Sequence, residues 1–533
     1  MRLREQFLRP DALIEPLVNR WYAWSFLLSP ATAAMFTCNL HIRVLESFLQ
    51  DPQLHRRAAK EPLMRGGMFL DYAGDLEPVR ALLERTREIS AARVDFANGI
   101  RELSQLLMIQ SASTGLSDLY GKVPIALKGT VELIYDLQHH LSFRLIEPLL
   151  YKSSIHDESL QSISLECTNE ESRPFALSTP RFAEPGRTSL SIPLSSPLLD
   201  LLSAARETAV SSQLEEFLIT QVADTRATTS LYSLFTDAAP YIPQDREYRG
   251  PGVRIRYFGH ATVLVQTAKI AILLDPLISY PATADQPSRF ALHDLPMHID
   301  FILLTHAHQD HVSLETLLQI RHRVNTIVVP RCGSGALQDP SLKLMLKSVG
   351  FQHIVELDEL ESLAVCGGQI IGVPFLGEHG DLDIRSKLAY CIRIHERGLL
   401  FLADSNGLEP RLYERLVASL GQIDALYIGL ECDGAPLSWL YGPLFSRPVP
   451  RAVDQSRRLN SSDANAALRI IEAIDPRRVF VYAMGLEPWL NHVSSINYTP
   501  QSRPITESTA LLEACRRLNR PAERLFLTHE VYL

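Results

Sequence analysis

A run of metal-binding side chains stands near the middle of the chain, in the stretch FILLTHAHQDHV at residues 301–312. The apolar residues and the threonine at its start predict a short buried strand, and His306, His308, Asp310 and His311 follow at once. On a loop leaving a strand, alternate residues point the same way, so His306 and His308 can bind one metal ion. Asp310 and His311 lie past the turn and can face a second. The sequence therefore predicts a two-metal site here.

The HxHxDH spacing of these residues resembles the metal-binding motif of the metallo-β-lactamase fold superfamily. In that superfamily the remaining ligands follow the ends of later strands. Asp404, directly after the apolar run GLLFLAD, fits the position of the bridging carboxylate. After the strand that ends near Pro374 the superfamily usually has a histidine, whereas this chain offers Glu378 beside His379.

A last histidine is expected after the strand predicted at 479–483, but the chain continues there as Ala-Met-Gly. His492, in GLEPWLNH, is the nearest candidate, and His529 is the alternative on a predicted terminal strand. His260 stands in a GHATVLV setting that resembles the lactonase and phospholipase-D-like branch of the superfamily. That resemblance implies a place near the metals without making His260 an assured ligand.

Glu378 bears on the kind of chemistry. Zinc hydrolases of this fold use histidine-rich sites, in which a metal-bound hydroxide attacks an ester, lactone or amide. With Glu378, Asp310 and Asp404 together, three carboxylates would surround two metals. Hard anionic donors favour iron and stabilise its ferric state, which dioxygen activation requires.

The elements around these residues predict an α+β protein with two domains. Residues 1–240 are expected to form an α-rich domain with a small sheet, and residues 250–533 a catalytic αββα sandwich. A Pro- and Gly-rich stretch at 237–253 separates them. In the first domain, helices are expected at 11–28, 80–108 and 124–151 and strands at 159–167 and 188–194. The second domain opens with a predicted three-stranded meander at 254–274.

Composition sets limits on partners and compartment. The 533 residues carry a net charge of −9, which argues against binding nucleic acid or anionic membranes through bulk electrostatics. The seven cysteines lack CxxC spacing, which fits a reducing cytoplasm better than a disulfide framework. The N-terminus has no apolar signal-peptide region, and the stretch Trp21–Phe36 is interrupted by Pro30, so no membrane span is expected.

Taken together, the helical N-terminal region, the HxHxDH motif, Glu378 and Asp404 resemble the diiron β-hydroxylase of chloramphenicol biosynthesis and its relatives. That resemblance implies a diiron monooxygenase that hydroxylates the β-carbon of an amino acid, held as a thioester on the carrier domain of a nonribosomal peptide synthetase. Dioxygen and an external electron donor or reductase would be co-substrates. The N-terminal domain would serve docking or formation of a homodimer.

The same resemblance assigns the ligands. His306, His308 and Glu378 would bind one iron, and Asp310, His311 and the late histidine, His492, the other. Asp404 would bridge the two irons.

The competing interpretation is a binuclear zinc or manganese hydrolase of the lactonase or phosphodiesterase type. The GHATVLV and HxHxDH motifs favour it, because many hydrolases share them, and Glu378 disfavours it. The sequence does not indicate which amino acid, synthetase or electron donor takes part.

A Pro-, Gly- and Arg-rich stretch, Asp433–Asn460, is expected to be a loop near the site. Its aromatic residues Trp439, Tyr441 and Phe445 either wall an apolar substrate cavity or only pack the loop onto its own domain. Arginines of the same stretch are candidates for contact with an acidic carrier helix: Arg447, Arg451, Arg457 and Arg458.

Overall fold

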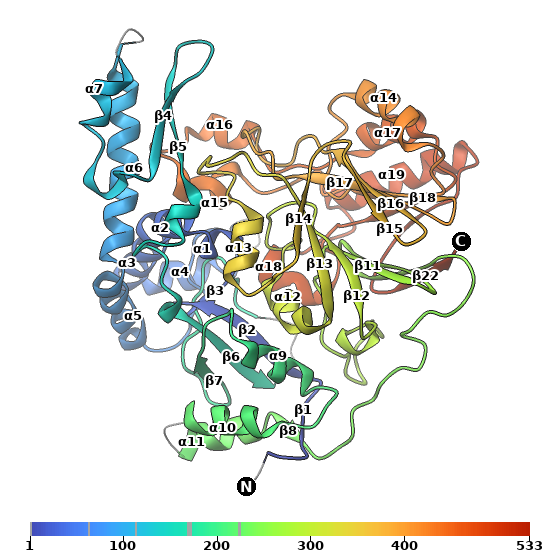
Figure 1. The fold of residues 1–533 in the computed structure, drawn as a ribbon, viewed down its shortest axis with the longest axis horizontal. Coiled ribbons are helices and arrows are strands. Elements are labelled where there is room, and N and C mark those ends of the chain that lie inside the picture. Colours follow the sequence, from blue (N-terminus) through green and yellow to red (C-terminus); the bar gives the residue numbers. More distant parts are fainter. Residues whose placement is uncertain (1–2, 62–63, 65, 112–114, 168–172, 222–224) are drawn as a thin grey trace.

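Two seven-stranded sheets pack face to face in the C-terminal half of the chain (Figure 1). The structure is a computed structural model and describes residues 3–61, 64, 66–111, 115–167, 173–221 and 225–533. The first sheet has the order β14 (Ile354–Leu357), β13 (Val324–Pro330), β12 (Ile299–Leu303), β11 (Ile270–Leu274), β10 (Thr262–Thr267), β9 (Arg254–Gly259), β22 (His529–Tyr532). The second has the order β15 (Ser362–Val365), β16 (Gly368–Pro374), β17 (Leu388–Ile394), β18 (Arg397–Phe401), β19 (Ala425–Gly429), β20 (Val479–Tyr482), β21 (Ala522–Arg524).

Helices cover the outer face of each sheet. The space between the sheets is filled by one apolar cluster, to which β10 contributes Val263 and Val265 and β17 contributes Tyr390 and Ile392. A second cluster joins the other face of the second sheet to α14 (Pro410–Leu420), α17 (Ala464–Ile474) and α19 (Arg503–Arg517). The first sheet is covered by α12 (Leu314–Ile320) and α13 (Leu342–Ser348). These four layers confirm the predicted αββα sandwich.

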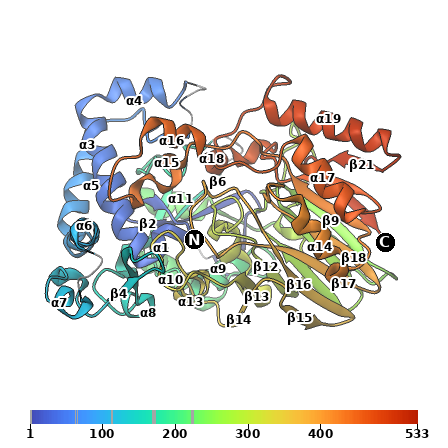
Figure 2. The same cartoon turned by 90° about the horizontal axis from the view of Figure 1, so that it is seen from above.

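The N-terminal region is α-rich and carries a small sheet, as expected. Its helices are α1 (Ser25–Leu28), α2 (Pro30–Phe36), α3 (Ile42–Gln50), α4 (Pro52–Ala58), α5 (Leu76–Ile89), α6 (Ala91–Ile109), α7 (Leu116–Tyr120), α8 (Glu147–Leu150), α9 (Pro197–Ala204), α10 (Ser212–Gln221) and α11 (Thr225–Tyr232). Among them, α3, α5, α6 and α7 lie on the side of the molecule opposite α14, α17 and α19 (Figure 2). The sheet has the order β3 (Trp21–Tyr22), β2 (Ala12–Val18), β6 (Gln161–Cys167), β7 (Thr188–Ser191).

One buried core runs from this region into the sandwich. Leu45 and Phe96 belong to the same apolar cluster as Leu317 of α12 and Ile302 of β12. The N-terminal region therefore shares its packing with the outer helical layer of the first sheet. The domain boundary predicted near residues 240–250 stays a prediction, because buried residues on both sides of it form a single cluster.

Two predicted helices are wrong. Residues 11–28 form the strands β2 and β3 before the short helix α1, because all seven residues of β2 are buried and β2 pairs along its length with β6. The strand, ALIEPLV, is buried on both faces and its charged Glu15 is paired inside the protein, so it shows no alternation of apolar and polar residues that would distinguish it from a helix. Residues 124–151 contain the hairpin β4 (Val131–Tyr135) and β5 (Leu141–Leu145), where Asp136 accepts turn hydrogen bonds from the amides of Gln138 and His140.

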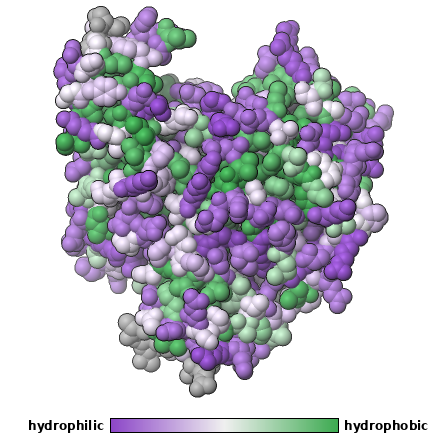
Figure 3. Space-filling model, in the orientation of Figure 1, coloured by the Kyte–Doolittle hydropathy of each residue, from purple (hydrophilic) through white to green (hydrophobic). Residues whose placement is uncertain are grey.

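The arginine-rich stretch near the site is partly helical. It contains α15 (Leu437–Tyr441), a short 3₁₀ turn and α16 (Arg451–Ser456). On the face shown in Figure 3, hydrophilic side chains dominate and hydrophobic ones form scattered patches. In the described part of the chain, no helix is both long and apolar enough to cross a membrane.

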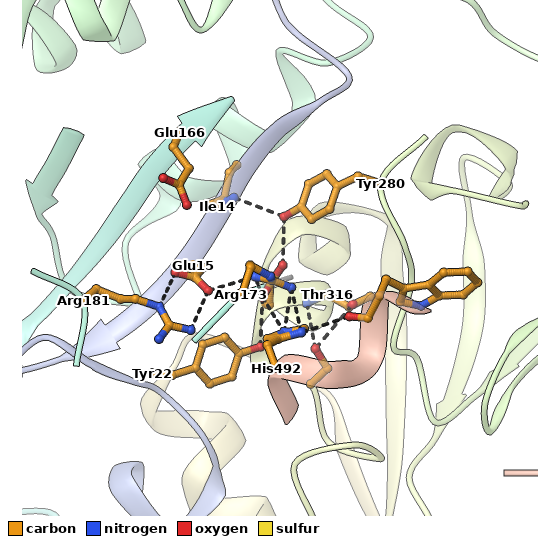
Figure 4. A network of polar contacts seen from close by, with 12 residues as sticks. Ile14, Glu15, Tyr22, Glu166, Arg173, Arg181, Tyr280, Thr316 and His492 are labelled. Atoms are coloured by element: carbon orange, nitrogen blue, oxygen red, sulfur yellow. Dashed lines mark hydrogen bonds and ion pairs between the residues drawn. The ribbon is translucent and has the colours of Figure 1, made fainter. Parts of the chain in front are cut away.

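A buried ionic network ties the N-terminal sheet to the sandwich (Figure 4). The Arg173 guanidinium lies 2.9 Å from Glu15 Oε1 on β2 and 3.0 Å from Glu315 Oε2 on α12. Tyr22 and Tyr280 each donate a hydrogen bond of 3.0 Å to the carboxylate of Glu315. Burial alone would raise the pKa of Glu315, but Arg173 holds it at about 2.

Replacing Arg173 by Met is expected to destabilise the fold at pH 7 by roughly 3–5 kcal/mol, because Glu315 would stay buried without its cation. Urea unfolding measures the change. In the wild type, the stabilisation that ionised Glu315 gains from Arg173 is present above the ordinary pKa of 4.5 and is lost as pH falls from there to about 2. The free energy of unfolding of the variant should therefore fall less between pH 4.5 and pH 2 than that of the wild type.

Arg80→Met is the matched control for this substitution. Arg80 pairs with Glu77 at 3.7 Å on the exposed face of α5, and such surface pairs contribute about 1 kcal/mol or less. An equal loss of stability in both variants would contradict the role given to the buried network.

Candidate metal centre

Residues from several strand ends meet at one edge of the two sheets. His306, His308, Asp310 and His311 lie on the loop after β12. Glu378 follows β16, and Asp404 follows β18 of the opposing sheet. The isolated bridge between His306 and Lys387 joins this loop to the segment before β17. The carboxyl ends of β12 and β18 thus bring the predicted residues together from both sheets.

A first group surrounds Glu378. His308 Nδ1 lies 2.8 Å from Glu378 Oε1, and His306 Nε2 lies 3.9 Å from Glu378 Oε2. The neighbouring His379 also contacts Glu378, with Nδ1 3.0 Å from Oε2. Ligand atoms of these four residues all lie within 4.8 Å of one another. Glu378 is therefore turned into the site, as the iron hypothesis requires, and His379 lies beside it.

A second group surrounds Asp310 and Asp404. His311 Nε2 lies 2.9 Å from Asp404 Oδ2, and His306 Nε2 lies 3.7 Å from the same oxygen. His260 Nε2 lies 3.3 Å from Asp310 Oδ2. Asp404 thus faces His306, from the first half of the HxHxDH motif, and His311, from its second half. This is the position expected of a bridging carboxylate.

Further contacts orient the histidines from behind. Asp275, at the end of β11, lies 2.8 Å from His311 Nδ1 and accepts a hydrogen bond of 2.6 Å from the Thr305 hydroxyl. His308 Nε2 lies 2.9 Å from the hydroxyl of the buried Tyr441 on α15. Such partners select which ring nitrogen faces the metal and increase its basicity.

The backbone at these strand ends is unusual. Glu378, Ala403 and His260 have φ angles of +68°, +46° and +50°, in the left-handed region that residues with a Cβ rarely adopt. Gly377 precedes Glu378 with φ +81°. Such conformations persist only where the surrounding structure enforces them, and they concentrate at functional sites.

Charge is concentrated in this site. Burial lowers the pKa of His311, but the carboxylates of Asp404, Asp275 and Asp310 more than offset it and hold that pKa well above the ordinary value. Burial would raise the pKa of Glu378, yet the imidazoles of His308 and His379 hold it well below its usual range.

The free donor atoms fit bound cations. Some buried atoms form no hydrogen bond with the described residues, although several of them lie close to an opposite charge: His306 Nε2, His311 Nε2, His260 Nε2, Glu378 Oε2 and Asp404 Oδ1. Buried polar atoms are normally satisfied, so unpartnered imidazole and carboxylate atoms converging on one place are the arrangement that metal ions complete. The mixture of imidazole and carboxylate donors suits two iron ions.

The expectation for His492 does not agree with the structure. Its Nδ1 donates to the Trp489 carbonyl at 3.0 Å, and its Nε2 accepts from Arg173 at 2.6 Å (Figure 4). Both ring nitrogens are thus engaged in the buried ionic network, and burial together with the Arg173 cation lowers the pKa of His492. The alternative, His529, lies on the edge strand β22 and contacts Glu523 at 3.1 Å. His260 is the additional histidine that the fold brings to Asp310.

Sequence reasoning missed two residues of the site. Glu431, two residues beyond β19, lines the same cavity as His308 and Asp404, and its only sequence feature is its place after a strand. Burial and the nearby Asp404 raise the pKa of Glu431 well above its usual range. The contact of Tyr441 with His308 was not foreseen, although the aromatic character of its segment was.

Metal content will separate ligands from neighbours. Asp404→Ala and His311→Ala are expected to retain about one metal ion or fewer per chain, because each removes a donor from the second group. His492→Ala and His529→Ala are expected to retain both, as measured by mass spectrometry of the purified proteins. Loss of one ion in His492→Ala would restore His492 to the ligand set.

The Tyr441 contact has its own consequence. Tyr441→Phe is expected to keep both metals but to weaken binding roughly 10- to 100-fold in competition with a chelator, because the His308 ring loses its hydrogen-bond partner. Tyr532→Phe, on the exposed end of β22, is the control. Unchanged affinity in Tyr441→Phe would remove Tyr441 from the site.

Comparisons with known proteins agree with this geometry. A family model described as the diiron non-heme beta-hydroxylase N-terminal domain matches residues 7–239, and a beta-lactamase superfamily domain matches residues 271–482. A 4-amino-L-phenylalanyl-[CmlP-peptidyl-carrier-protein] 3-hydroxylase from Streptomyces venezuelae is 37% identical over 99% of each chain. A metal-dependent hydrolase of Geobacillus thermodenitrificans is 38% identical over 77 residues, which cover 14% of this chain and 30% of that protein.

A solved structure matches the whole fold. The crystal structure of CmlA, a diiron beta-hydroxylase from Streptomyces venezuelae, superposes with a TM-score of 0.92 at 36% identity and covers 100% of both chains. This match runs the full length of the chain, whereas the hydrolase match covers 14% of it. The chain belongs to the diiron non-haem β-hydroxylase family, whose catalytic half has the metallo-β-lactamase fold.

Proposed function

We propose that this protein is a dioxygen-dependent diiron monooxygenase that hydroxylates the β-carbon of an aminoacyl group, held as a thioester on the carrier domain of a nonribosomal peptide synthetase. The full-length relative is named for 3-hydroxylation of an amino acid carried on a peptidyl carrier protein, which supports this substrate class. The observation that carries the proposal is Glu378, which faces His308 at 2.8 Å inside the metal-binding group.

For the metal ligands, we propose His306, His308 and Glu378 at one iron, Asp310 and His311 at the other, and Asp404 between them. When bound and reduced by an external electron donor, the two irons supply the activation of dioxygen. His260, 3.3 Å from Asp310, holds that carboxylate in place instead of serving as an assured ligand. Tyr441 fixes the His308 ring so that Nδ1 faces the metal and Nε2–H donates to its hydroxyl oxygen.

The residues around the ligands shape a small substrate cavity. Its volume is about 110 Å³, and His308, Asp310, Glu378 and Asp404 form its floor. Apolar side chains from three parts of the chain form the walls: Phe175, Leu177, Trp439, Leu440, Leu459 and Ile496. Apolar walls exclude water from the reacting carbon, which protects an oxidising site from side reactions. Trp439 is thus part of the wall of this cavity, which supports the first of the two interpretations of the aromatic residues at 439–445. Phe445 lines a separate groove.

A second cavity supports access by a tethered substrate. It holds about 310 Å³ and shares Gly66 and Phe175 with the substrate cavity. Lys60 beyond α4 and Asn491 on α18 (Asn491–Ser494) lie on its rim, so it opens between the N-terminal region and the sandwich. A phosphopantetheine arm entering here would carry its acyl group to the metals from a carrier docked on both regions.

The remaining partners are also part of the proposal. Arg447 and Arg451 are exposed and can meet an acidic carrier surface, while Arg457 and Arg458 lie 3.8 Å from Asp381 and 3.6 Å from Asp433. We further propose an external reductase as partner, a cytoplasmic location, and a homodimer formed through the N-terminal region.

Turnover with matched substrates tests the proposal. Reduced enzyme is given dioxygen and either a free amino acid or the same amino acid loaded on a carrier domain, and the product is analysed by mass spectrometry. Only the loaded form is expected to gain one oxygen atom. Equal turnover of both forms would contradict the carrier requirement, and rapid cleavage of the thioester without dioxygen would indicate a hydrolase instead.

A further inference from the structure

We infer that the chain has an additional small-molecule site, separate from the metal centre, which binds a ligand with an apolar body and one carboxylate. The site is a cavity of about 390 Å³. Two arginines, Arg206 and Arg323, belong to its wall, and they are called the cavity arginines below. The cavity shares no lining residue with the substrate cavity at the metal-binding residues.

This cavity lies where the N-terminal region meets the sandwich. The paired strands β1 (Phe7–Leu8) and β8 (Phe235–Thr236) contribute to one side, and Arg206 follows α9. Arg323, directly before β13, belongs to the sandwich. Apolar side chains from both regions make up most of the lining, among them Phe7, Leu8, Ala238, Pro240, Pro281 and Leu292. Such walls suit the apolar part of a ligand, with a few polar groups to fix its orientation.

Positive charge is in excess at the polar end of the cavity. Glu207 is the only carboxylate among the described lining residues, and two arginines share it: its Oε1 lies 2.9 Å from Arg246 and 2.8 Å from Arg323. No ion pair engages Arg206 in the described part of the chain, and its hydrogen bonds go to neutral oxygens of the backbone and of Gln319. Three guanidinium groups therefore meet one carboxylate.

Other carboxylates in the neighbourhood have partners of their own. Asp11 is paired with Arg9 at 2.6 Å, and Glu247 accepts a hydrogen bond of 2.8 Å from the amide of Met297. Neither makes an ion pair with the cavity arginines among the described residues. Burial lowers the pKa of both cavity arginines, because a buried guanidinium loses its hydration. An anionic ligand would compensate this loss.

The cavity arginines also keep hydrogen-bond donors in reserve. Arg206 Nε and Arg323 Nη1 are buried and have no hydrogen-bond partner within the described ranges, and Arg323 as a whole is only 6% exposed. Buried donors are normally satisfied, so these two atoms call for an acceptor. The planar fork of a guanidinium matches the two oxygens of a carboxylate. Together with the apolar walls, the unpaired donors favour an amphipathic carboxylate over an inorganic anion.

Calorimetric titration with two matched probes tests the inference. 4-Phenylbutyrate and 4-phenylbutyramide have the same apolar body and differ in the charge of the terminal group. The wild-type diiron protein is expected to bind one equivalent of the carboxylate roughly 10- to 100-fold more tightly than the amide. Arg323→Met is expected to reduce this preference to about threefold or less, because a charge and its N–H donors leave the wall.

A variant that keeps every charge guards against misfolding of Arg323→Met. Ala239→Trp adds a large side chain at an exposed position of the lining, and it is expected to weaken binding of 4-phenylbutyrate about tenfold or more by filling the cavity. Arg415→Met, on the exposed face of α14, is the control and should bind as the wild type does. Urea unfolding of each variant shows that it is folded.

Four results would each overturn the inference. They are no binding of 4-phenylbutyrate, equal affinity for the two probes, wild-type binding in both Arg323→Met and Ala239→Trp, and a change in the optical spectrum of the irons on titration. The last would place the carboxylate at the metals. None of these results depends on turnover, so the test is independent of the proposed hydroxylation.

Discussion

The structure depends on compensating the charge that it buries at one edge of two sheets. Glu378, Asp404 and three histidines of the central motif are each less than about a tenth exposed, and Asp310 lies beside them. Carboxylates in such surroundings are tolerated only when cations or hydrogen bonds compensate them. Two metal ions supply that compensation, and the left-handed backbone at the strand ends brings the ligands within reach of one another.

The helical N-terminal region takes part in forming this site. Arg173 joins β2 of the N-terminal sheet to α12, the helix that directly follows the metal-binding loop. Phe175, two residues further on, lines both the cavity at the metal-binding residues and the second cavity beside it. Removing the ionic network would therefore affect the cavity walls as well as stability.

Local patterns in the sequence predicted what is local in the structure. The motif at 301–312 is a strand followed by a loop, so its candidate metal-binding side chains could be predicted from spacing, and Asp404 and Glu378 from their places after apolar strands together with the resemblance to the superfamily; the structure brings these residues together. His492 could not be assigned in this way, because its partner Arg173 is 319 positions away in sequence and takes the ring nitrogen that a metal would need. Glu431 belongs to no motif, and only the fold shows which neighbours surround it.

The fold class could be predicted from the order of the elements, whereas the two segments at 11–28 and 124–151 were predicted as helices and contain strands. The strands of the sandwich alternate with helices and turns, which identifies an αββα arrangement. The strand β2 is buried on both faces, including its paired Glu15, so it lacks the alternation of apolar and polar residues typical of a strand, and only its pairing with β6 distinguishes it from a helix.

Isotope labelling during a single turnover tests the central claim most directly. The reduced diiron protein, with a carrier-bound aminoacyl substrate, is exposed to ¹⁸O₂ in ordinary water, and the acyl group is analysed by mass spectrometry. The account predicts one ¹⁸O atom on the β-carbon and an intact thioester. A product oxygen that comes from water, or release of the acyl group without incorporation, would contradict dioxygen activation at this site.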